Sequence, residues 1–148
     1  MKNKMIIILV TIASLIVIID QASKLWVTSF VKESCGNENF GFELTTNTGI
    51  AFGINKGNTK NIILSVFGLF IIFMFLKKQY ERIDTKTMVA IALVLGGAIS
   101  NLIDRIFRDG ILDFIRVYKL PVFNIADVLI LLGGLLLIIF LVDFTRKN

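Results

Sequence analysis

The amino-acid sequence predicts an all-α integral membrane protein of four transmembrane helices, with a small extracytoplasmic β-sheet between the first two helices. Hydrophobic residues make up 55% of the 148 residues, and only one residue is proline. A soluble domain of this length is less apolar and carries more charge. Four long apolar segments recur along the chain, and we expect them to form a single membrane domain over residues 1–148.

The apolar segments predict the positions of the helices. We expect transmembrane helices at about 5–24, 60–77, 87–105 and 125–143. Each uncharged run is slightly shorter than the roughly 20 residues that cross ~30 Å of hydrocarbon, so the helices must include flanking polar residues. The first run resembles a signal peptide, but its helical pattern continues past Asp20 to Trp26 with no small-residue cleavage site. We therefore expect it to be retained as a helix.

The connection between the first two helices carries a different pattern. Phe40, Phe42 and Leu44 alternate with glycine, glutamate and threonine, which is the period of a half-buried strand. Gly49 and Gly53 indicate a bend between two short strands. The sequence therefore predicts an outer β region at about 38–56.

The distribution of positive charge predicts an orientation. The net charge is +5, but the lysines and arginines are scattered over short loops and form no basic face, which argues against a nucleic-acid partner. They cluster near the N-terminus, in residues 77–86 and at the C-terminus, so both termini and this loop are expected in the cytoplasm. Asp20, Asp104 and Asp127 then lie at the outer ends of their helices.

The types of residue that are absent exclude several chemistries. The chain has no histidine and a single cysteine, Cys35. This excludes a Ser-His-Asp triad, a Cys-His pair, a Cys/His zinc site and an internal disulfide. Catalysis, if present, must use Asp, Glu, Lys, Ser, Asn or Arg. Ionisable residues within membrane segments are functional candidates by default.

The third apolar segment concentrates polar residues on one face. In "GGAISNLIDRI", Gly97 and Asn101 share a helical face with Asp104 or Arg105. One interpretation is a functional stripe. The alternative is a small-residue packing face, with Asp104 and Arg105 simply paired with each other at the interface.

Two aspartates stand out near the start of the last helix. Asn124 is a good N-cap, and Asp127 in the first turn is favoured by the helix dipole, so capping alone could explain Asp127. Asp113, however, lies in the same outer connection among apolar residues. Two close carboxyl groups repel each other, which raises one pKa and lets the pair act as general base and general acid on water.

The ordered motifs resemble those of the lipoprotein signal peptidases, also called signal peptidase II. The matching blocks are "DQASKLWV", "NTGIAFG", "GGAISNLIDR" and "LDFI" followed by "PVFNIAD", which together run from Asp20 to Asp127. The resemblance implies a four-helix aspartyl endopeptidase with Asp113 and Asp127 as the catalytic pair and no metal or organic cofactor. It also implies a set of substrate-binding or supporting residues: Asp20, Lys24, Asn47, Gly49, Asn101, Asp104, Arg105, Asn124 and Ala126. The segment "RVYKLPV" between the last two blocks is shorter than is usual in the family.

The family resemblance also implies a substrate and a location. The expected substrate is a prolipoprotein, cut before its diacylglyceryl-modified cysteine by a multi-pass, monomeric enzyme of the bacterial cytoplasmic membrane. The active site would lie near the outer face, in contact with membrane lipids. A four-helix transporter or channel is the alternative, but it requires a charge deep in a helix such as "IILSVFGLFIIFMFL", which has none. "DGILDF" begins like a CDP-alcohol phosphatidyltransferase motif but lacks its remaining residues.

Overall fold

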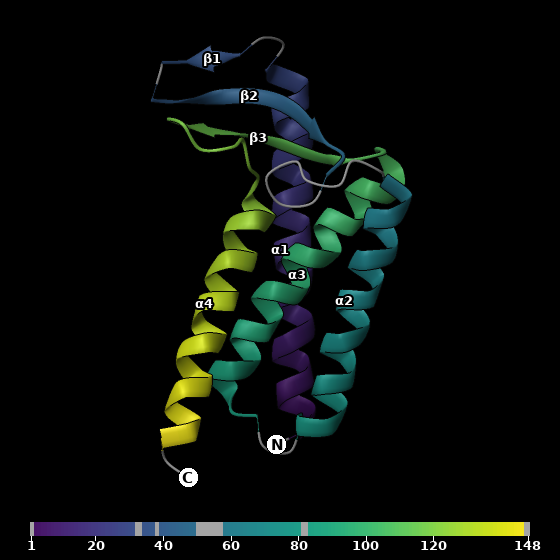
Figure 1. Ribbon diagram of the computed structural model, residues 1–148, viewed down its shortest axis with the longest axis vertical. Coiled ribbons are helices and arrows are strands. Elements are labelled where there is room, and N and C mark those ends of the chain that lie inside the picture. Colours follow the sequence, from purple (N-terminus) through teal and green to yellow (C-terminus); the bar gives the residue numbers. More distant parts are fainter. Residues whose placement is uncertain (1, 32–33, 38, 50–57, 81–82, 147–148) are drawn as a thin grey trace.

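The protein is a bundle of long helices with a small sheet across one end (Figure 1). The computed structural model describes residues 2–31, 34–37, 39–49, 58–80 and 83–146. In chain order the elements are α1 (Lys2–Phe30), β1 (Cys35–Gly36), β2 (Phe40–Asn47), α2 (Asn58–Gln79), α3 (Thr85–Phe107), β3 (Ile111–Val117) and α4 (Ile125–Arg146). Both termini lie at the end of the bundle opposite to the sheet (Figure 1).

The helices have the length and composition of membrane spans. Among the described residues, Asn3–Phe30 of α1, α2 and α3 are each long and apolar enough to cross a membrane, and α4 contributes a shorter apolar stretch, Ile125–Phe140. Large apolar side chains such as Phe70 and Leu131 point outward and are exposed, as expected where lipid is the solvent. A mostly helical chain with apolar, membrane-capable helices is thus confirmed, whereas the count of four spans stays a prediction.

Helix α3 is central, because α1, α2 and α4 all pack against it. A Cβ atom on Gly96 would lie 2.9 Å from the backbone oxygen of Ala13 in α1, and one on Gly97 would lie 2.7 Å from that of Ala126 in α4. Since both neighbours are backbone atoms, only glycine lets the two helices approach α3 this closely. The predicted small-residue face therefore packs on two helices at once.

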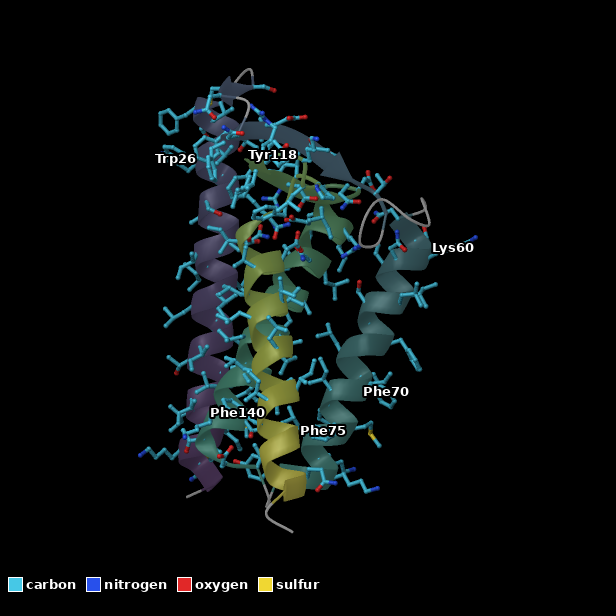
Figure 2. The ribbon with its side chains drawn as sticks, turned by 60° about the vertical axis from the view of Figure 1, so that its left-hand side comes forward. Trp26, Lys60, Phe70, Phe75, Tyr118 and Phe140 are labelled. Atoms are coloured by element: carbon cyan, nitrogen blue, oxygen red, sulfur yellow. The ribbon has the colours of Figure 1, made fainter. Side chains whose placement is uncertain are left out.

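Helix α1 continues beyond the expected end at about residue 24 and reaches Phe30. The extra turns support the sheet, because Val27 and Val31 form a small core with Phe114 of β3. Trp26 also contacts Phe42 of β2, with ring centroids 6.3 Å apart. Figure 2 shows Trp26 and Tyr118 at the sheet end of the bundle.

The sheet has three antiparallel strands in the order β1-β2-β3. A small sheet was expected between the first two helices. β1 and β2 lie there, but β3, which was not expected, comes from the connection between α3 and α4. The expected second strand after Gly49 falls on residues 50–57, outside the described residues. In β3 the apolar Ile111 and Phe114 are buried, and Ile111 pairs with Asn47 of β2. Asp113 therefore lies within a strand, opposite Thr45.

Candidate active site

Asp113 lies in β3 and is held by two side-chain amides. Its side chain is almost completely buried, with 2% exposure. The amide nitrogen of Asn47 in β2 donates to Oδ2 of Asp113 at 3.2 Å, and that of Asn124 donates to Oδ1 at 2.6 Å. The pairing of β2 with β3 brings Asn47 to Asp113, and the start of α4 brings Asn124 to it.

Asp127 lies in the first turn of α4, next to its N-cap residue Asn124. Oδ1 of Asn124 accepts the backbone N–H of Asp127 at 2.9 Å, and Oδ2 of Asp127 accepts that of Asn124 at 3.4 Å. The first-turn capping contacts predicted for Asp127 are therefore present. Its other oxygen, Oδ1, accepts from the amide of Asn101 in α3 at 2.8 Å, a contact that capping does not require.

Two asparagines connect the two aspartates. The amide nitrogen of Asn124, which already donates to Asp113, also donates to Oδ1 of Asn101 at 3.2 Å. The amide of Asn101 in turn donates to Asp127, so a short chain of hydrogen bonds runs from one carboxyl group to the other. Asn101 and Asn124 are themselves buried. The geometry thus brings together two carboxyl groups that are 14 positions apart in the sequence.

The environment of Asp113 adjusts its acidity. Burial, followed by the negative charge of Asp127, raises the pKa of Asp113 from 3.8 to about 6. The hydrogen bonds from Asn47 and Asn124 and the charge of Lys24 act in the opposite direction. A carboxyl group with this pKa exchanges its proton near neutral pH, which is what acid–base catalysis requires.

A buried ionic cluster lies beside the pair. Nζ of Lys24 is 2.6 Å from Oδ2 of Asp20 and 2.6 Å from Oδ2 of Asp104, and all three side chains are fully buried. Arg108 also pairs with Asp104. The alternative interpretation, in which Asp104 and Arg105 simply pair with each other, does not hold, because Asp104 faces Lys24 of α1 and Arg105 faces the end of β2.

Arg105 faces the connection that follows β2. Its Nη2 donates to the backbone oxygen of Gly49 at 3.2 Å, and the N–H of Gly49 donates to Oδ1 of Asn47 at 2.9 Å. The negative charges of Asp113 and Asp127 act on the guanidinium group of Arg105, so all three groups are close enough to interact electrostatically. Asn47 and Gly49 therefore adjoin the aspartate pair, whereas the remaining motif residues after Gly49 lie outside the described residues.

The comparisons with known proteins agree with this arrangement. The family model described as signal peptidase (SPase) II matches residues 12–143. The chain belongs to this family. A lipoprotein signal peptidase from Clostridium novyi (strain NT) is 36% identical over 137 residues, covering 84% of this chain and 90% of the relative. The predictions of the signal peptidase II family, of lipoprotein signal peptide cleavage and of a peptidase hydrolase are confirmed.

Two solved structures, each described as a bacterial membrane enzyme studied by the in meso method, are similar to this chain in fold. One has a TM-score of 0.81 at 30% identity, covering 95% of this chain and 90% of the solved one. The other has a TM-score of 0.76 at 31% identity, covering 90% and 91%. The chain is accordingly a bacterial membrane protein of the signal peptidase II family.

Three polar residues of the buried cluster, Ser100, Gln21 and Arg108, were not among the predicted site residues. The hydroxyl group of Ser100 donates to Oδ2 of Asp20 at 2.7 Å, and the amide of Gln21 donates to Oδ1 of Asp104 at 2.9 Å. Arg108 was also missed, although it follows Asp104 by four positions, the spacing at which opposite charges pair on a helix. That spacing was the signal available in the sequence.

Proposed function

We propose that this chain is an aspartyl endopeptidase of the bacterial cytoplasmic membrane, with Asp113 and Asp127 as its catalytic pair. It cuts prolipoproteins before the diacylglyceryl-modified cysteine. The observation that carries the assignment is the pair of buried carboxyl groups joined through Asn124 and Asn101. In a chain without histidine, two such carboxyl groups are sufficient for water-mediated peptide hydrolysis.

The two carboxyl groups take different roles. Asp127 lies in the first turn of α4, where its Oδ1 accepts from the amide of Asn101 and a carboxylate is compatible with the helix dipole. We assign it as the general base that removes a proton from water, whose oxygen then attacks the scissile carbonyl carbon. Asp113, with a pKa of about 6, donates a proton to the carbonyl oxygen. When the tetrahedral intermediate breaks its C–N bond, the proton on Asp127 passes to the leaving amine, and Asp113 takes back a proton from a hydroxyl group of the intermediate, which restores both carboxyl groups.

Arg105 is suited to hold the substrate peptide. It is largely buried, and its Nε has no hydrogen-bond partner among the described residues. Such a buried donor is unfavourable unless a ligand satisfies it. The backbone carbonyl oxygen of an extended substrate is the matching acceptor, and Asn47, Gly49 and Asn101 surround the same region.

The proposed topology has four spans, cytoplasmic termini and an active site near the outer face. The positive-inside pattern supports it, and so does the arrangement in Figure 1, in which both termini lie opposite to the sheet. Trp26 at the sheet end (Figure 2) has the amphipathic ring that favours a membrane–water interface. The enzyme is proposed to act as a monomer, surrounded by lipids that contact the exposed apolar side chains of α2 and α4.

Two experiments test these proposals. Purified protein incubated with a lipidated prolipoprotein should release the signal peptide. A membrane-impermeant maleimide applied to intact cells should label Cys35, which is exposed in β1, and should spare a cysteine introduced as Gln79→Cys. The reverse labelling would contradict the orientation, and no released peptide would contradict the activity.

A further inference from the structure

The buried ionic cluster touches the backbone immediately before each proposed catalytic aspartate. Oδ2 of Asp104 accepts the N–H of Leu112 at 3.1 Å, and Leu112 directly precedes Asp113. Oδ1 of Asp20 accepts the N–H of Ala126 at 2.9 Å, and Ala126 directly precedes Asp127. Two carboxylates of one cluster therefore fix the two chain segments that present the pair.

Lys24 joins the two halves of this arrangement. Its Nζ lies 2.6 Å from a carboxylate oxygen of Asp20 and 2.6 Å from one of Asp104. A continuous set of contacts thus runs from the β3 backbone through Asp104, Lys24 and Asp20 to the α4 backbone. With Arg108 included, the cluster has two positive and two negative charges and is neutral, which suits its burial.

The cluster is placed to act on the aspartates and not on the substrate. Lys24, Asp20 and Asp104 have no exposed surface, so a substrate cannot reach them. Charged groups at these distances inside a protein form strong hydrogen bonds with little freedom of movement. Their partners are the main-chain N–H groups of Leu112 and Ala126, so a shift of either carboxylate acts on the chain segment that leads into a proposed catalytic aspartate.

We infer that Asp20, Lys24 and Asp104 form a positioning unit that sets the separation of Asp113 and Asp127. The inference rests on the proposed function, because it takes those two aspartates as the catalytic pair. It predicts that a change in the unit alters the chemical step and leaves substrate binding nearly intact. A purely structural cluster would instead lower the amount of folded enzyme without changing the rate of each folded molecule.

The test compares Asp104→Ala with Asp104→Asn in detergent-purified full-length enzyme. Asp104→Ala removes the acceptor of the Leu112 N–H, and displacement of catalytic groups by about 1 Å lowers the rate about 10²-fold. We expect kcat per folded molecule to fall by about this factor, with KM changed less than about threefold. Asp104→Asn keeps an oxygen of the same size for the Leu112 N–H, so it should retain more of kcat than Asp104→Ala.

Ile16→Ala is the matched control. Ile16 is buried in the same contact between α1 and α3, where it packs beside Gly96, but it touches neither N–H group. It should lower the melting temperature and leave the kcat of the folded enzyme unchanged. The inference is overturned if the folded Asp104 variants keep kcat within about threefold of wild type, or if Asp104→Asn loses as much as Asp104→Ala. Activity in Asp113→Asn or Asp127→Asn would instead overturn the proposed function.

Discussion

Asn124 combines two tasks that substitution can separate. Its Oδ1 caps α4 through the N–H of Asp127, and its Nδ2 donates to Asp113 at 2.6 Å and to Asn101. Loss of an N-cap costs about 1 kcal/mol, and a hydrogen bond to a charged group contributes about 1.5–3 kcal/mol. We therefore expect Asn124→Ala to lower the free energy of unfolding by about 3 kcal/mol and Asn124→Ser, which keeps a capping oxygen, by about 2 kcal/mol.

Both Asn124 variants should damage catalysis to the same extent, although they differ in stability. The amide of Asn124 favours the ionised form of Asp113, so its removal raises the pKa of Asp113 above about 6. The limb of the pH–rate profile that reports Asp113 should then move to higher pH. We also expect kcat to fall about 10²-fold, because the contact that fixes Asp113 is lost.

The assay is single-turnover cleavage of a lipidated prolipoprotein across pH, alongside thermal unfolding of the same samples. Asp84→Ala is the matched control, because Asp84 caps α3 by accepting the N–H of Thr87 at 2.9 Å and is exposed. It should cost about 1 kcal/mol of stability and leave the rate of the folded enzyme unchanged. An Asn124→Ser enzyme with wild-type rate and pH profile would refute the proposed link between Asn124 and Asp113.

Three further predictions follow from the same contacts. The pKa of Asp113 is raised from 3.8 to about 6, so ionisation of this group disfavours the folded state. As the pH rises from 4 to 6, the free energy of unfolding of wild type should therefore fall by up to about 3 kcal/mol relative to that of Asp113→Asn. Parallel curves of unfolding free energy against pH for the two proteins would contradict this. Gly97→Ala should lower both activity and melting temperature, because a Cβ would meet the α4 backbone, whereas Gly134→Ala, with nothing within 4 Å, should be neutral or stabilising. Arg105→Ala should raise KM with little loss of folded protein, because Arg105 is proposed to bind the substrate backbone. If the variant instead yields less folded protein while the folded fraction keeps its specific activity, the role of Arg105 is purely structural.

Much of the candidate site could be predicted because its residues occupy regular elements. Asn101, Asp104 and Arg105 follow helical spacing, and Asn124 and Asp127 follow capping rules, so short-range geometry was sufficient to indicate them. The motif order then indicated the family. These features depend on neighbours within one or two helical turns.

The remaining features depend on contacts between distant segments. Strand β3, which contains Asp113, could not be predicted from the sequence, because only pairing with β2 makes its backbone part of a sheet. The ion pair between Asp104 and Lys24 could not be predicted from the sequence, because it depends on how α1 packs on α3. The role of Ser100 depends on the same packing.

The most direct measurement is the cleavage rate of purified Asp113→Asn, Asp127→Asn and the double variant on a lipidated prolipoprotein. A single positioned acid or base contributes about 10²–10⁴-fold, so each single variant should lose at least this much while staying folded. The double variant should be little worse than the weaker single variant, because the two groups act as a unit. The control is Asp109→Asn, on an exposed residue at φ 58° where asparagine is well tolerated, and it should retain wild-type activity. A folded Asp127→Asn enzyme that cleaves at near wild-type rate would contradict the aspartyl mechanism.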